Sequence, residues 1–203
     1  MAILGAVIVP HPPLIISTVG HGREQEVQST IDAYRAATKQ AAAWNPEVLI
    51  ITSPHQIMYS DYFHISPGRG ATGDMAAFGA SETKLRVEYD AQLRDEIIRC
   101  GESAGLQVGT LGQRDPYLDH GTFVPLYFLR EAGVDCPILR IGLSGFSPLD
   151  HYRLGQCIAQ AVENLGRRAV FIASGDLSHK LKDDGPYGFA PEGPEFDRQI
   201  TEA

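Results

Sequence analysis

Short apolar runs that stop abruptly constrain the fold of this chain more than any other feature. Ile3–Val9, residues 48–52 and Ala169–Ser174 are dense in Val, Ile, Leu and Ala and run directly into Pro, Ser or Gly. Strands of a parallel sheet have this composition because helices bury both of their faces. The carboxyl ends of such strands open onto the ligand crevice of α/β proteins. The residues that follow these runs are therefore the first candidates for function.

Helical patterns alternate with the strands. Apolar spacing predicts helices over residues 23–44, 91–104 and 148–165, with Asp90 and Ser147 as the N-caps of the last two. Further strands are expected over 62–66, 85–89 and 137–143, a short helix over 122–132 despite Pro125, and the start of a helix over 195–203. This alternation predicts an α/β fold, a three-layer sandwich with a mostly parallel central sheet and helices on both faces.

Length and composition narrow the class of protein. A chain of 203 residues favours a single domain, residues 1–203, and a net charge of −8 argues against a nucleic-acid partner. Three widely spaced cysteines fit a reducing cytoplasm. The N-terminal apolar run follows no Lys or Arg and is cut by prolines, so we expect neither a signal peptide nor a membrane span. The Gly-rich residues 67–79 are predicted to form a lid over a site.

Two histidines follow predicted strands. His11 comes directly after the first apolar run, and His55 comes after the second. If the two strands are neighbours in the sheet, their neutral imidazoles can converge on one divalent metal ion. Prolines beside each ring stiffen the backbone and reduce the entropy lost when the ligands are ordered.

His179 and His120 are candidates for other roles. His179 closes the segment SGDLSH after the last strand, and Asp176 could fix the tautomer of an imidazole there. His179 could be a base or a third ligand. His120 lies in a turn that leads into a helix, where the helix dipole favours a neutral hydrogen-bond donor. The sequence contains neither GxxxxGK[ST] nor GxSxG, and the GRGATG segment is not followed by a helical pattern.

Four motifs in this order resemble a known family. VPHPP around His11, SPH at His55, DHGT at His120 and SGDLSH at His179 are similar to the class III extradiol ring-cleavage dioxygenase B-subunit family, the catalytic LigB-like proteins. The resemblance is strongest to the Memo-like branch, which is often fused to a C-terminal AMMECR-type domain. It covers essentially the whole chain.

The resemblance implies a role for each histidine. His11 and His55 would bind the metal, His179 would be the active-site base, and His120 would contact the substrate or dioxygen. The remaining ligand of the family is a glutamate, or a cysteine in some Memo-like members, and no position in this chain matches it. Glu192 and Glu195 are in the wrong motif. We therefore expect that the C-terminal part of the domain is missing and leave open whether a further domain follows.

The implied function is a non-haem Fe(II)-dependent extradiol ring-cleavage dioxygenase, an oxidoreductase that incorporates O2. Zinc is an alternative metal in a purified sample. The expected partners are a small aromatic diol and O2, with no membrane contact, and a homo-oligomer is left open. The alternative is a Memo-like metal-binding protein with a redox or protein-recognition role and no catechol cleavage. A metal-dependent hydrolase that uses Asp176 is disfavoured, because it would need more carboxylates at strand ends.

Overall fold

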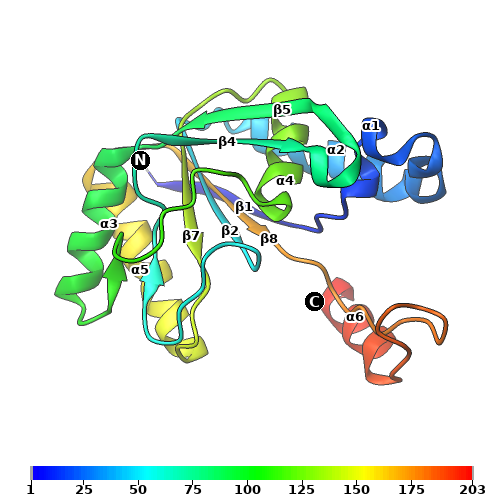
Figure 1. Cartoon of the computed structure of the whole chain (residues 1–203). Helices are drawn as coiled ribbons and strands as arrows, with labels where there is room; N and C mark the ends of the chain where they lie inside the picture. The colour runs from blue at the N-terminus through cyan, green and yellow to red at the C-terminus, as the bar shows by residue number, and fades with distance from the viewer. Residues whose placement is uncertain (1, 203) are drawn as a thin grey trace.

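A parallel four-stranded sheet forms the centre of the computed structural model, which describes residues 2–202 (Figure 1). Its strands lie in the order β1 (Ile3–Val9), β8 (Ala169–Ser174), β2 (Val48–Ser53) and β7 (Ile138–Gly142). All neighbouring pairs are parallel, so the carboxyl ends of all the strands meet at one edge. The predicted strands are therefore confirmed, and β2 and β8 are mostly buried, but β1 is an edge strand in which Ile8 is 76% exposed, so its predicted burial on both faces was wrong.

Helices cover both faces of this sheet. Helices α2 (Gln28–Ala43) and α4 (His120–Glu131) pack on one face, and α3 (Ala91–Ser103) and α5 (Pro148–Asn164) pack on the other (Figure 1). Successive residues of β2 alternate between the two cores: Leu49 joins the first, whereas Val48 and Ile50 join the second. The expected three-layer α/β sandwich is confirmed.

Side-chain caps determine where the helices begin. The Asp90 carboxylate accepts the backbone N–H of Leu93 at 3.0 Å and starts α3, as predicted. Ser147 accepts the backbone N–H of Asp150 at 3.2 Å, which confirms it as the N-cap of α5, and its hydroxyl donates to the Asp150 carboxylate at 2.6 Å. The helix expected over 122–132 begins earlier, at His120, because Asp119 is its N-cap.

The Gly-rich segment 67–79, predicted to be a lid loop, is mostly part of a β-hairpin, so the prediction of a loop was wrong. Strand β4 (Gly70–Met75) pairs antiparallel with β5 (Ala80–Glu88), and only a 3-10 turn, η3 (Ala76–Phe78), connects them. Val87 and Met75 are buried in the core beneath the hairpin. Gly70 lies so close to the Val87 carbonyl that a Cβ would collide with it, so the glycine serves strand pairing rather than loop flexibility.

The remaining elements are short or peripheral. They are η1 (Pro13–Ile15), α1 (Ser17–Gly20), η2 (Arg23–Val27), β3 (Phe63–His64), β6 (Val108–Gly109) and α6 (Glu192–Glu202). Helix α6 begins before the expected start at residue 195, the predicted end at Ala203 lies outside the described residues, and the helix lies apart from the sheet in Figure 1. Across residues 2–202, no helix has the length and apolarity that crossing a bilayer requires.

Candidate active site

Three of the four predicted histidines meet at the carboxyl edge of the sheet. His11 follows β1, His55 follows β2, and His120 is the first residue of α4. One ring nitrogen of each lies within 4.8 Å of the other two. The ring centroids are 4.0 Å apart for His55 and His120 and 4.9 Å apart for His11 and His55. The sequence motifs thus converge on one cluster, which we call the histidine cluster.

The strands that carry His11 and His55 are not neighbours, an arrangement that the sequence had left open. Strand β8 lies between β1 and β2 and pairs with both. The two segments that follow β1 and β2 approach each other beyond the end of β8, and the Nε2 atoms of His11 and His55 are 3.1 Å apart. The last residue of β8, Ser174, consequently lies against the His11 ring.

His11 is the most firmly held member of the cluster. The residue is 2% exposed, its backbone N–H donates to Oδ1 of Asp176 at 2.8 Å, and its Nδ1 lies 2.9 Å from Oγ of Ser174. Burial lowers the pKa of the His11 ring, an effect that the charge of Asp176 partly offsets and the neighbouring His55 reinforces. The ring is therefore neutral near pH 7, as a metal ligand must be.

His55 is positioned through its backbone. Its N–H donates to Oγ of Ser53 at 3.1 Å, and that hydroxyl donates to Oδ1 of Asp119 at 2.8 Å. A Cβ on Gly121 would collide with the Ser53 hydroxyl and lie 3.1 Å from the His55 ring. Only glycine therefore allows the N-terminus of α4 to approach the end of β2 so closely.

A buried ion pair anchors the N-terminus of α4. Asp119 accepts the backbone N–H of Thr122 at 2.9 Å and pairs with Nη2 of Arg140 at 3.0 Å. Arg140 is 1% exposed and also donates to the Tyr89 hydroxyl at 3.2 Å. Burial raises the pKa of the Asp119 carboxyl, but the hydrogen bonds from Thr122 and Ser53 and the charge of Arg140 together lower it below its ordinary value.

Neither member of the Asp119–Arg140 ion pair was predicted from the sequence. Arg140 is a charged residue in the middle of the otherwise apolar strand β7, and such a residue requires a buried partner. That signal was present, but the sequence does not identify Asp119 as the partner.

His120 faces the tip of the β4–β5 hairpin. Burial lowers the pKa of its ring, and the neighbouring His55 and His11 lower it further. The ring of Phe78, in the hairpin turn, packs edge-on against it with a centroid separation of 5.4 Å. Phe78 is 39% exposed, so part of its ring is open to an incoming molecule. The hairpin thus contributes an aromatic wall, although it is not the predicted loop.

His179 lies beside the cluster on the other side of Asp176. Its Nε2 is 3.4 Å from Oδ2 of Asp176, the same oxygen that lies 3.8 Å from Nε2 of His11. The side chain is 50% exposed, and its ring is 5.0 Å from that of Tyr187. Asp176 therefore bridges His179 to the histidine cluster.

The donor chemistry of the cluster fits a divalent metal ion. Metal–nitrogen bonds of about 2.0–2.1 Å allow two nitrogens at the observed separation to bind the same ion. Both His11 and His55 have Nε2 directed into this space, and His120 supplies a third nitrogen. Neither Glu192 nor Glu195 of the distant helix α6 belongs to the cluster, and Glu195 pairs instead with Arg198. The residues present therefore fit a metal held mainly by imidazole.

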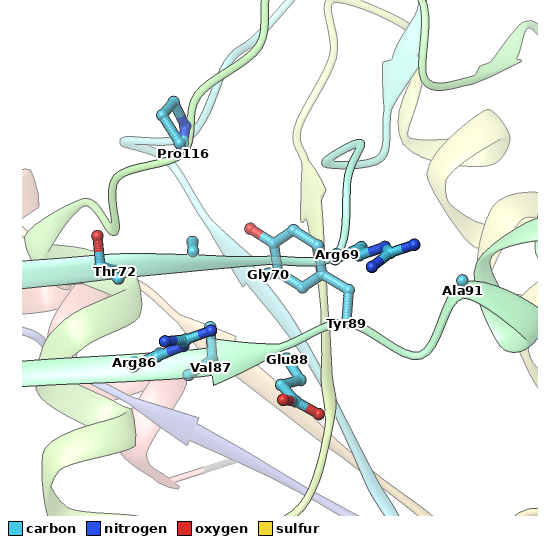
Figure 2. A pocket seen from close by; sticks show the side chains of 10 residues that line it. Arg69, Gly70, Thr72, Arg86, Val87, Glu88, Tyr89, Ala91 and Pro116 are labelled. Atoms are coloured by element: carbon cyan, nitrogen blue, oxygen red, sulfur yellow. The ribbon is translucent and has the colours of Figure 1, made fainter.

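A pocket of about 620 Å³ lies elsewhere, along the β4–β5 hairpin (Figure 2). Arg69, Arg86 and Glu88 line it, together with Tyr89 and Pro116, and none of the four candidate histidines does. We place the site at the histidines, because reactive groups and not hollow volume determine the chemistry. The Tyr89 hydroxyl connects the pocket wall to Arg140 and so to Asp119.

Named relatives are similar to the chain over most of its length. Protein CA_C1420 of Clostridium acetobutylicum is 34% identical over 207 residues, which cover 98% of this chain and 44% of the relative. The 2-aminophenol 1,6-dioxygenase beta subunit of a Pseudomonas species is 28% identical and covers 87% of this chain and 63% of its own length. An Escherichia coli 2,3-dihydroxyphenylpropionate/2,3-dihydroxicinnamic acid 1,2-dioxygenase is 27% identical, with 77% of this chain and 51% of the enzyme covered. The chain thus spans less than two thirds of the length of these relatives.

A solved structure and a family comparison complete the assignment. The uncharacterized protein JW3007 of Escherichia coli K12 shares the fold with a TM-score of 0.53 at 16% identity, covering 83% of this chain and 64% of that protein. The family described as the catalytic LigB subunit of aromatic ring-opening dioxygenase matches residues 5–203. The resemblance that the four histidine motifs indicate is thereby confirmed, and the chain belongs to this LigB family.

Proposed function

We propose that this chain holds ferrous iron at His11 and His55 and opens the ring of a small aromatic diol beside its two hydroxyl groups. One observation carries the proposal: the Nε2 atoms of the two residues lie 3.1 Å apart at the carboxyl edge of the sheet. Iron bound there would supply the reaction with dioxygen. The names of two relatives, which refer to an aminophenol and to dihydroxyphenyl acids, support an aromatic substrate with adjacent polar groups.

His179 is the proposed base. Its Nε2 faces the Asp176 carboxylate, so an Nε2–H directed at that carboxylate would leave Nδ1 free to accept a proton. The half-exposed ring can reach a substrate that enters from solvent. It would take a proton from one substrate hydroxyl and return it later.

His120 and Phe78 are the proposed substrate contacts. A neutral His120 donates one hydrogen bond to the negative charge that develops on the substrate oxygen. Phe78 presents a partly exposed aromatic face beside it. Aromatic rings gain about 0.5–1.5 kcal/mol from stacked or edge-on pairing, which favours a flat ring over an aliphatic diol.

Besides His179, which the sequence left open as base or ligand, two residues are candidates for the third protein ligand. His120 supplies a nitrogen within 4.8 Å of its partners, whereas Asp176 supplies a carboxylate oxygen 3.8 Å from Nε2 of His11. A carboxylate would complete the two-histidine, one-carboxylate set common among non-haem iron oxygenases. The variants His120→Ala and Asp176→Asn separate these assignments, because only the loss of the true ligand weakens metal binding strongly.

Anaerobic calorimetric titration with ferrous iron, and separately with zinc, tests the metal site. We expect one ion per chain in the native protein and no saturable binding in His11→Ala or His55→Ala. His21→Asn is the matched control, because His21 is an exposed histidine with left-handed backbone that Asn tolerates. Retained one-to-one binding in His55→Ala would refute the ligand assignment.

Oxygen consumption tests the reaction itself. The iron-loaded chain is mixed with catechol, 2-aminophenol or 2,3-dihydroxyphenylpropionate, and His179→Ala should retain the metal but lose oxygen uptake. Metal binding without uptake of oxygen on any of these substrates would favour the alternative, a Memo-like metal protein with a redox or recognition role. Loss of metal in His179→Ala would make His179 a ligand. Under the main proposal the protein acts in the cytoplasm on a small aromatic diol and dioxygen.

A further inference from the structure

A proline interrupts the hydrogen bonds of α4 close to the histidine cluster. Pro125 is the sixth residue of the helix and has no backbone N–H. In a regular α-helix the N–H of residue 125 would donate to the carbonyl of residue 121. Pro125 therefore leaves the Gly121 carbonyl without this partner, although Gly121 is buried.

Ser174 supplies the missing donor from another element. It is the last residue of β8, is 5% exposed, and its Oγ lies 2.5 Å from the Gly121 carbonyl oxygen. A carbonyl oxygen can only accept, so the single hydroxyl proton of Ser174 points at Gly121. The serine thus joins the central strand to the first turn of α4.

The same hydroxyl oxygen lies 2.9 Å from Nδ1 of His11. Because the proton of Ser174 is already directed at Gly121, the hydroxyl oxygen must accept in this second bond, and Nδ1 of His11 must donate. A neutral imidazole carries one proton, so Nε2 of His11 then has a lone pair. That atom is the one that lies 3.1 Å from Nε2 of His55.

We propose that Ser174 is a positioning residue that holds His11 in the Nδ1–H tautomer and so aims the Nε2 lone pair into the histidine cluster. A proline in α4 therefore determines a ring tautomer in three steps: Pro125 leaves the Gly121 carbonyl without a donor, Ser174 donates to that carbonyl, and His11 donates to Ser174. The consequence for metal binding rests on the proposed function. The tautomer itself exists in the metal-free protein and can be measured there.

Asp176 is the charged competitor for a proton on Nε2 of this ring, whereas Nε2 of His55, at 3.1 Å, can donate to or accept from Nε2 of His11 and so fits either tautomer. Oδ2 of Asp176 lies 3.8 Å from Nε2 of His11, which is too long for a hydrogen bond, and Oδ1 of Asp176 already accepts the His11 backbone N–H. The opposite tautomer would also turn the Ser174 proton toward Nδ1 and leave the buried Gly121 carbonyl unsatisfied. The free energy needed to leave a buried carbonyl without a hydrogen bond corresponds to a preference of roughly 5- to 150-fold for the Nδ1–H tautomer of His11.

Long-range proton–nitrogen correlation NMR of the metal-free chain, labelled with ¹⁵N-histidine, measures the tautomer directly. At a pH of about 8, where the ring is neutral, we expect Nδ1 of His11 to carry the proton in at least about 80% of molecules, as the lower end of that preference requires. The His11→Gln spectrum identifies the signal. A wild-type His11 with its proton mainly on Nε2 would overturn the proposal without the need for any Ser174 variant.

Variants then test whether Ser174 is the cause. In Ser174→Ala we expect at least about a fivefold shift of the ratio toward Nε2–H, and metal affinity lower by about 10- to 100-fold. Ser174→Thr keeps the hydroxyl and should restore the ratio. Ser103→Ala is the matched control, since the exposed Ser103 hydroxyl also donates to a helix carbonyl, at 2.8 Å from that of Arg99. An unchanged ratio in Ser174→Ala would overturn the role of the serine.

Pro125→Ala provides an independent route to the same conclusion. The new N–H can donate to the Gly121 carbonyl and free the Ser174 proton, so we expect the Nδ1–H preference to weaken. A preference that is unchanged in both Pro125→Ala and Ser174→Ala would contradict the hydrogen-bond chain. If the tautomer is as expected but no metal binds, the proposed metal site fails and the tautomer assignment stands.

Discussion

Replacement of Arg140 by methionine tests how the buried ion pair supports the site. Arg140 is 1% exposed and pairs at 3.0 Å with Asp119, whose carboxylate is 9% exposed. Methionine keeps most of the apolar volume but leaves the Asp119 charge without its cationic partner. Removal of one partner of a buried pair costs about 3–5 kcal/mol. Against a total free energy of unfolding of about 5–15 kcal/mol, this loss is a large fraction of the stability.

Arg35→Met is the matched control. Arg35 pairs with Glu131 at a similar distance, 2.9 Å, but the two side chains are 53% and 41% exposed. Exposed ion pairs contribute about 0.2–1 kcal/mol, so the free energy of unfolding of Arg35→Met should be close to that of the native protein. The two substitutions remove the same chemical group, in one case from a buried pair that also bonds Tyr89 and in the other from an exposed pair.

Urea denaturation of the metal-free protein measures both variants. The single tryptophan, Trp44, packs beside Gly5 of β1 and reports on the integrity of the sheet. The double variant Arg140→Met/Asp119→Asn no longer has an unpaired buried charge. Its loss of unfolding free energy should therefore be smaller, by about 0.5–3 kcal/mol, than the sum of the losses in the two single variants. Equal destabilisation by Arg140→Met and Arg35→Met would refute the reasoning.

Two further predictions concern packing and pH. A Cβ on Gly121 would collide with the Ser53 hydroxyl, so Gly121→Ala should lower the free energy of unfolding by about 1–3 kcal/mol and weaken metal binding. The control is Gly155→Ala in α5, where a Cβ would meet nothing within 4 Å and should raise the free energy of unfolding by up to about 1 kcal/mol. Denaturation and calorimetry that show the two variants alike would contradict this prediction. Burial lowers the pKa of three histidines below 6.5, namely His11, His64 and His120. The unfolded chain then binds more protons, so the metal-free protein should lose stability as the pH falls from about 7.5 to about 5.5, and a flat or rising urea midpoint would disprove this.

Local signals made most of the elements predictable. Apolar runs identified the strands of the central sheet, and Asp90 and Ser147 identified helix starts, because each of these signals acts within a few residues of the chain. The β4–β5 hairpin was mistaken for a lid, since Gly70 serves close backbone packing against β5 and Gly73 allows the close approach of Leu118. Glycine in a sequence indicates permitted conformations but not which neighbour requires them.

The sequence by itself determined that His11 and His55 follow strands of the central sheet and that the chain resembles the LigB family. Only the tertiary structure decided which groups meet. The insertion of β8 between β1 and β2 placed Ser174 against His11. The partner of Arg140, 21 residues away along the chain, was equally invisible to local reasoning. Strand order and long-range partners depend on how the whole core packs, whereas periodicity and capping are properties of short segments.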